Sequence, residues 1–147
     1  MKTRYYALVF GLVALVLGIL GFIPSLLTPL PAGAPPMAMG GYYGVLFGLF
    51  PVNVLHNLIN VVLGLWGLAA WRNFDAARVY ARTITVIMAV LAVFGLVAGF
   101  DTLFGLVPLY SNDVWLHAVF AVVGAYFGWA PVRRVSTVRE STTGIRR

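Results

Sequence analysis

Apolar residues run through this chain in four long stretches, which are separated by short segments rich in proline, glycine or charge. A helix needs about 20 apolar residues to cross a hydrocarbon core of about 30 Å. The stretches predict four transmembrane helices, at about residues 5–25, 51–71, 79–100 and 114–130. The expected fold is therefore an all-α membrane protein, a four-transmembrane-helix bundle in residues 1–134, with residues 135–147 as a flexible basic cytoplasmic tail.

The connecting segments differ in composition. Residues 24–41 hold five of the eight prolines, which indicates a loop. Residues 44–50 are apolar and precede Pro51, so we expect a short interfacial or re-entrant helical piece that breaks at this proline. Residues 72–78 predict a charged turn, and residues 101–113 predict a second long loop.

The second apolar stretch carries four polar side chains near its start: Asn53, His56, Asn57 and Asn60. Each residue of a helix advances by about 100°, so these four positions fall on one face that is about 100° wide. Polar groups in a hydrocarbon layer are costly unless they find partners. The spacing therefore predicts that this face points into the protein.

Composition supports lipid as the solvent. Hydrophobic residues make up 61% of the chain and charged residues 10%, and the mean hydropathy is +0.94. An ordinary soluble domain is about 25% charged. The chain has no cysteine, which excludes disulfides, thiolate metal sites and cysteine nucleophiles.

The net charge of +6 predicts sidedness in a membrane. All ten Lys and Arg residues lie at the N-terminus, in residues 72–82 or after residue 132, and none lies in the 24–41 or 101–113 loops. The positive-inside rule then places both termini and the 72–78 turn in the cytoplasm. Nucleic acid is not an expected partner, because the basic clusters lack interleaved aromatic and polar readers.

A motif occurs twice along the chain. Leu46-Phe-Gly-Leu49 recurs as Leu103-Phe-Gly-Leu106, and a proline follows each copy after one intervening residue. A Leu-His pair comes next in both halves, with histidines at His56 and His117. We therefore predict two tandem helical-hairpin repeats, related by an axis along the membrane normal, with the two histidines at equivalent positions.

The segments Phe50-Pro-Val-Asn-Val-Leu-His-Asn-Leu58, Thr102-Leu-Phe-Gly-Leu-Val-Pro108 and Asn112-Asp-Val-Trp-Leu-His117 carry a family resemblance. Together they resemble domain-of-unknown-function family 4383, a family of uncharacterised bacterial four-helix integral membrane proteins. The resemblance covers about residues 5–130. It implies a four-span fold and no particular activity. The expected location is the bacterial cytoplasmic (inner) membrane.

The polar residues of the predicted outer half support a structural or partner-binding role. Asp113 is placed to cap the fourth helix, and His117, one turn later, is placed to bond to it. Hydrogen bonds between transmembrane helices contribute about 0.6–2 kcal/mol each. The expected partners are the lipid bilayer, other membrane proteins or a second copy of the chain. No catalytic residue is expected.

Three alternatives give the same cluster a ligand. His56 and His117 are the candidate axial ligands of a haem in an electron-transfer protein. The candidate residues of the surrounding shell are Asn53, Asn57, Asn60 and Asp113. A quinone, another small molecule or a proton relay is the second alternative. A zinc site made of His56, His117, Asp101 and Asp113 is the third.

Overall fold

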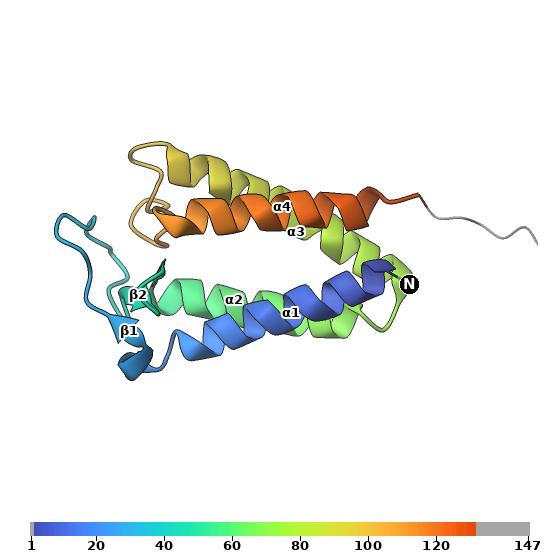
Figure 1. Ribbon diagram of the computed structural model, residues 1–147, viewed down its shortest axis with the longest axis horizontal. Coiled ribbons are helices and arrows are strands. Elements are labelled where there is room, and N and C mark those ends of the chain that lie inside the picture. The colour runs from blue at the N-terminus through green and yellow to red at the C-terminus, as the bar shows by residue number, and fades with distance from the viewer. Residues whose placement is uncertain (1, 132–147) are drawn as a thin grey trace, which may run out of the picture.

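The computed structural model describes residues 2–131, and the fold is mostly helical. Four helices form two antiparallel hairpins: α1 (Lys2–Leu20) packs along α2 (Val54–Ala70), and α3 (Phe74–Leu96) packs along α4 (Asn112–Trp129) (Figure 1). The N-terminus, the α2–α3 turn and the C-terminal end of α4 lie at one end of the molecule. The predicted tail, residues 135–147, lies outside the described residues.

Asparagine side chains begin two of the helices. Asn53 is the N-cap of α2 and accepts a hydrogen bond from the backbone N–H of His56, at 2.9 Å. Asn73 is the N-cap of α3 and accepts from the backbone N–H groups of Asp75 and Ala76, at 2.8 and 3.2 Å. Both caps satisfy N–H groups that have no partner inside the helix. The second cap explains why α3 begins within the segment predicted as a turn.

A small antiparallel sheet replaces the helical piece predicted for residues 44–50, so that prediction was wrong. Strands β1 (Leu27–Thr28), β2 (Gly44–Leu46) and β3 (Phe50–Val52) lie in the order β1-β2-β3, after a short 3₁₀ helix, η1 (Pro24–Leu26). Phe47 and Gly48 have φ values of 53° and 68°, which turn the chain back between β2 and β3 and exclude a helix there. Pro51 lies in an edge strand, where its missing N–H is tolerated.

The Phe-Gly pairs of the two Leu-Phe-Gly-Leu motifs share positive φ values, whereas the first leucines differ, because Leu103 has a φ of 46° and Leu46 lies in β2. Phe104 and Gly105 have φ values of 59° and 81°, which are close to those of Phe47 and Gly48. In both copies the N–H of the last leucine donates to the carbonyl of the first, at 3.0 Å in the first copy and 3.2 Å in the second. The proline that follows each copy is fully buried. We call these segments the first turn (residues 46–49) and the second turn (residues 103–106).

Glycines allow close approach within each hairpin. A Cβ added to Gly64 of α2 would lie 2.6 Å from the backbone nitrogen of Leu15 in α1. A Cβ added to Gly124 of α4 would lie 2.6 Å from Oγ1 of Thr85 in α3. Glycine is therefore required at position 64, where the neighbouring atoms belong to the backbone, and at position 124 it leaves room for the Thr85 side chain.

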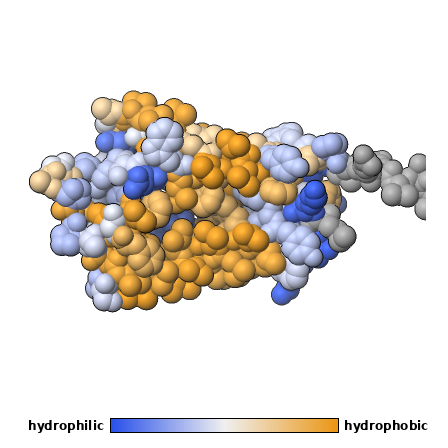
Figure 2. Space-filling view, in the orientation of Figure 1, coloured by the Kyte–Doolittle hydropathy of each residue, from blue (hydrophilic) through white to orange (hydrophobic). Residues whose placement is uncertain are grey.

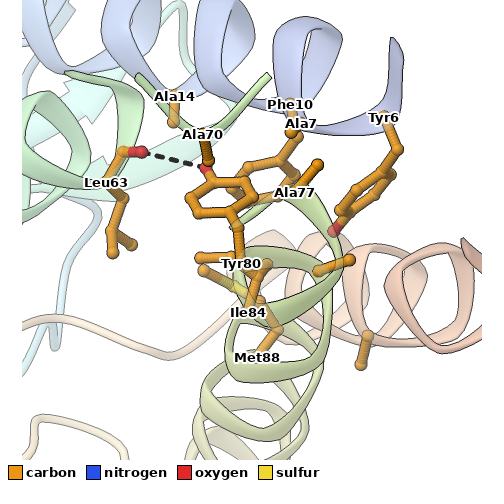
Figure 3. Close-up of a cluster of buried hydrophobic side chains, with 12 residues drawn as sticks. Tyr6, Ala7, Phe10, Ala14, Leu63, Ala70, Ala77, Tyr80, Ile84 and Met88 are labelled. Atoms are coloured by element: carbon orange, nitrogen blue, oxygen red, sulfur yellow. Dashed lines mark hydrogen bonds between the residues drawn. The ribbon is translucent and has the colours of Figure 1, made fainter. Parts of the chain in front are cut away.

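Two tyrosines cross between the hairpins in the hydrophobic core (Figure 3). Tyr80 of α3 is fully buried, and its hydroxyl donates to the carbonyl oxygen of Leu63 in α2, at 2.9 Å. Tyr6 of α1 reaches in the opposite direction, because a Cβ on Gly124 of α4 would lie 2.8 Å from its hydroxyl. Each hairpin thus sends one tyrosine into the other.

Two helices, α1 and α3, are long and apolar enough to cross a membrane, while α2 is apolar but shorter, at 17 residues. Figure 2 shows a surface whose middle is covered largely by hydrophobic residues, with hydrophilic residues toward both ends.

At the end that holds the N-terminus, Nε of Arg4 donates a hydrogen bond to the carbonyl oxygen of Trp71. At the same end, Nε of Arg82 donates a hydrogen bond to the carbonyl oxygen of Gly128. Arginine side chains thereby satisfy carbonyl groups at the C-terminal ends of α2 and α4.

Candidate functional site

A cluster of buried polar side chains lies where α2 and α4 begin, at the end of the molecule opposite the N-terminus. Asn53 caps α2, His56 and Asn57 lie in its first turns, and Asp113 and His117 lie in the first turns of α4. The exposed fractions of these five residues range from 0% to 7%. We call them the polar cluster. Three of them come from the predicted polar face of α2, whose fourth member, Asn60, is half-buried.

Asn53 uses its whole side chain to join three segments. Its Nδ2 donates to the carbonyl oxygen of Met39 in the proline-rich loop, at 2.9 Å, and to that of Leu106 in the second turn, at 2.7 Å. Its Oδ1 accepts the N–H of His56 at the start of α2. Both amide hydrogens and the carbonyl oxygen therefore have partners.

Asn112 makes the reverse connection. Its Nδ2 donates to the carbonyl oxygen of Leu49 in the first turn, at 3.1 Å. The first residue of α4 thus contacts the first turn, while the cap of α2 contacts the second turn.

The two histidines face one another across the cluster. Their ring centroids are 6.3 Å apart, with an angle of 43° between the ring planes. Asp113 approaches His56 rather than His117: its Oδ2 lies 3.7 Å from Nδ1 of His56. This distance is longer than a hydrogen bond. The hydrogen bond expected between Asp113 and His117 does not form. Among residues 2–131, Nδ1 of His117 has no hydrogen-bond partner. The carboxylate points across to α2 instead of along its own helix.

Helix dipoles contribute to the electrostatics of the cluster. The prediction that Asp113 caps α4 was wrong, because the helix begins earlier, with Ser111 as its N-cap and no side-chain hydrogen bond at the cap. Asp113 lies instead in the first turn, near the positive end of the helix dipole. No hydrogen-bond partner for its Oδ2 occurs within the described part of the chain. The Asp113 side chain is thus buried between the start of α4 and the His56 imidazole, without a hydrogen bond to its Oδ2.

Asn57 of α2 packs against the chain at the end of α1. Its side chain is fully buried, and a Cβ on Gly21 would overlap it. Neither its Nδ2 nor its Oδ1 has a hydrogen-bond partner among residues 2–131. Its observed contact is packing against α1, with glycine at position 21 providing the space.

Two small cavities adjoin the histidines. One, of about 40 Å³, is lined by His56, Asn60 and His117 together with apolar side chains. The other, of about 20 Å³, is lined by His56, Asn60 and Asp113. Cavities of this size hold water-sized guests, whereas pockets for drug-sized ligands measure about 300–1,000 Å³. A porphyrin or a quinone ring therefore does not fit beside the histidines unless the hairpins separate.

The proposed zinc ligands do not converge. Within residues 2–131 there is no group of three or more His, Cys, Asp or Glu side chains close enough to hold a metal ion. Asp101 is half-buried in the 101–113 loop, where its backbone carbonyl accepts from the N–H of Leu109. The four-residue zinc set is thus not assembled in this conformation.

Sequence reasoning missed a tyrosine pair beside the cluster. The Tyr43 hydroxyl donates its one hydrogen to the carbonyl of Pro35, at 2.8 Å, so the Tyr110 hydroxyl donates to the oxygen of Tyr43, also at 2.8 Å. Burial raises the pKa of the Tyr110 hydroxyl above its ordinary range, and this hydrogen bond raises it further. The pair ties the proline-rich loop to the segment before α4.

Comparison with known proteins places the whole helical region in one family. No curated protein and no solved structure matches the chain. The model of the domain of unknown function DUF4383 matches residues 4–130, and the chain belongs to that family.

Proposed function

We propose that this chain is a structural, four-span protein of the bacterial cytoplasmic membrane, in which the polar cluster fastens two tandem hairpin repeats together at the outer face. Both termini and the α2–α3 turn lie in the cytoplasm. Residues 1–134 form the membrane domain and residues 135–147 its cytoplasmic tail. The outer surface contacts lipid and neighbouring membrane proteins.

The membrane assignment is supported by the apolar surface and by the positions of the basic residues. Large apolar side chains are exposed along every helix, including Val9, Val62, Val86 and Val122, which are each more than half exposed. A soluble monomer rarely exposes so continuous an apolar surface. Every Lys and Arg of residues 2–131 belongs to α1, the α2–α3 turn or the first turns of α3, and the positive-inside rule assigns that end to the cytoplasm.

The duplication is supported by contacts that are exchanged between the halves. Asn53 bonds to the second turn and Asn112 to the first. Tyr80 reaches α2 and Tyr6 reaches α4. A two-fold axis between the hairpins produces such exchanged pairs, and it places His56 and His117 beside one another.

The structural role rests on one observation: both amide hydrogens of Asn53 and its carbonyl oxygen are bonded to the protein itself. A residue that binds a ligand keeps a donor or an acceptor directed at it. Two cavities that adjoin the histidines measure about 40 and 20 Å³. These features favour a role in holding the two hairpins together over a role in cofactor binding.

A second candidate, proton transfer or binding of a very small ligand, is favoured by the buried polar atoms that lack partners. Within residues 2–131 these include Nδ1 of both histidines and Oδ2 of Asp113. His56 and Asp113 also line one cavity together. Such groups in a membrane segment are commonly functional.

The sidedness can be tested directly because the chain has no cysteine. Gly33→Cys places a thiol in the proline-rich loop, and Arg72→Cys places one at the opposite end, both at exposed positions. A membrane-impermeant maleimide added to intact spheroplasts should label Gly33→Cys at once and Arg72→Cys only after lysis. The reverse pattern, or labelling of both variants before lysis, would contradict the assignment.

The absorption spectrum of the purified protein tests the structural role against haem binding. Purified in mild detergent, the protein should be colourless in its oxidised and reduced forms and should contain no stoichiometric metal. A Soret band that sharpens on reduction and disappears in His56→Ala would replace the structural role with bis-histidine haem binding.

A further inference from the structure

A groove of about 420 Å³ runs between α1 and α4, on the half of the molecule that holds the N-terminus. Its walls are apolar side chains of α1, such as Val9 and Val13, and of α4, such as Val119 and Val123. In Figure 2, which has the orientation of Figure 1, the surface is hollowed between the two hairpins. We call this hollow the α1–α4 groove.

Aromatic side chains close the floor of the groove. The rings of Phe10 and Phe120 meet edge to face, with centroids 4.8 Å apart, and those of Tyr6 and Phe127 lie 5.4 Å apart. At the cytoplasmic end, Oγ1 of Thr3 donates to the carbonyl oxygen of Phe127, at 3.0 Å. The groove is thus closed inward and open sideways, toward the surroundings of the bundle.

The length of the groove matches half of a bilayer. Its α1 wall extends from Lys2 to Val13, which is about 16 Å at 1.5 Å per residue. The hydrocarbon of one leaflet is about 15 Å thick, half of the 30 Å core. A thin, extended hydrocarbon chain therefore has the right length to fill it.

The charges at the end of the groove select the headgroup. Among the described residues that line it, Lys2 is the one charged side chain, and it lies at the cytoplasmic end. Arg4 and Arg82 lie at the same end of the bundle, each over a tryptophan ring, at 5.7 and 5.2 Å. A basic end next to an apolar slot is complementary to an anionic headgroup and its acyl chain.

We propose that the α1–α4 groove binds an anionic phospholipid of the cytoplasmic leaflet, with an acyl chain along Val9 and Val123 and the headgroup at Lys2. The inference rests on the membrane orientation proposed above. A helix of a second copy is the other occupant to consider. Lys2 at the end of the groove favours the lipid, and the experiment below distinguishes the two occupants.

The test compares two phospholipids of equal chain length, phosphatidylglycerol and phosphatidylcholine, added to the protein in mild detergent and counted by native mass spectrometry. The wild-type protein should retain one phosphatidylglycerol, with about a fivefold preference over phosphatidylcholine, the ratio that corresponds to one basic residue near an anionic lipid. Lys2→Gln should abolish the preference and keep binding of the neutral lipid.

The variant Val9→Trp/Val123→Trp fills the groove and should lose the retained lipid. Val86→Trp is the matched control, because Val86 is 58% exposed on α3 and does not line the groove. Lipid retention by the filled variant, equal retention of both lipids by the wild type, or no retention at all would overturn the proposal. A chain dimer that disappears in the filled variant would also overturn it.

The outcome is independent of the test of sidedness. Cysteine labelling reports the orientation whether or not a lipid is bound, so correct labelling with no retained lipid would overturn the groove proposal alone. Lys2→Gln alters an exposed side chain, so its result does not depend on whether the filled variant folds.

Discussion

The side-chain nitrogen of Asn53 lies 2.7 Å from the carbonyl oxygen of Leu106, and this hydrogen bond joins the start of α2 to the turn that precedes α4. The opposite bond, from Asn112 to the carbonyl of Leu49, joins the start of α4 to the turn that precedes α2. The two bonds differ in setting, because Asn53 is fully buried and Asn112 is exposed. The first should therefore contribute more to stability.

Asn53→Ala should destabilise the protein by roughly 2–4 kcal/mol. The substitution removes two side-chain hydrogen bonds, each contributing about 0.5–1.5 kcal/mol, and an N-cap that contributes about 1 kcal/mol. It also removes the side-chain donor to the carbonyl groups of Met39 and Leu106. The free energy of unfolding, measured by denaturant titration in mild detergent, reports the loss.

Asn112→Ala is the matched control, because it removes one exposed bond of the exchanged pair. Its cost should stay below about 1 kcal/mol, since an exposed donor and acceptor can both bond to water. Equal costs for the two variants would mean that Asn53 does not have the fastening role assigned to it.

Period and length made the helices predictable from the sequence. The four helices overlap the four apolar stretches, and the 100° spacing predicted the inward position of Asn53, His56 and Asn57. Both properties belong to single segments, so no knowledge of tertiary contacts was needed.

Features that depend on contacts between segments were not predictable in the same way. Residues 44–50 are as apolar as a helix, but their Phe-Gly pair adopts positive φ and the flanking residues pair as strands. Asp113 and His117 are one helical turn apart, so a local bond between them was the natural expectation. The carboxylate turns to His56 because α2 begins beside α4, a fact of tertiary packing.

Gly64→Ala should destabilise the α1–α2 hairpin by about 1–3 kcal/mol, the usual cost of overpacking a close contact. The new methyl group would lie 2.6 Å from the backbone nitrogen of Leu15, and backbone atoms cannot move aside as a flexible side chain can. Gly40→Ala is the control, because a Cβ at Gly40 meets no atom within 4 Å. Thermal unfolding of both variants distinguishes a packing effect from a general effect of replacing glycine. Equal unfolding temperatures would contradict the close contact.

His117→Leu should leave the stability unchanged or raise it by about 1 kcal/mol. Nδ1 of His117 is buried without a partner among the described residues, and an unsatisfied buried polar atom is costly. Leucine fills a similar volume without that cost, whereas His117→Ala should lose about 2–3 kcal/mol by opening a cavity. Unfolding in detergent compares the two variants. A large loss for leucine would show that the imidazole itself is needed, which favours the proton-transfer candidate.

Alkaline pH should loosen the proline-rich loop through Tyr110. Burial and the hydrogen bond to Tyr43 raise the pKa of this hydroxyl above the value of about 10 in an unfolded chain. The neutral form is therefore favoured in the folded state, so the stability that it contributes is complete below about pH 10 and is lost as the pH rises toward the higher folded-state pKa.

Tyr110→Phe removes the titrating group together with the hydrogen bond that it donates to Tyr43. Protease cleavage within residues 29–41 should rise above about pH 10 in the wild-type protein, while Tyr110→Phe should be cleaved faster at neutral pH and depend less on pH. Tyr126→Phe, at an exposed position on α4, should behave like the wild type. A wild-type loop whose cleavage stays constant through this range would contradict the role of the tyrosine pair.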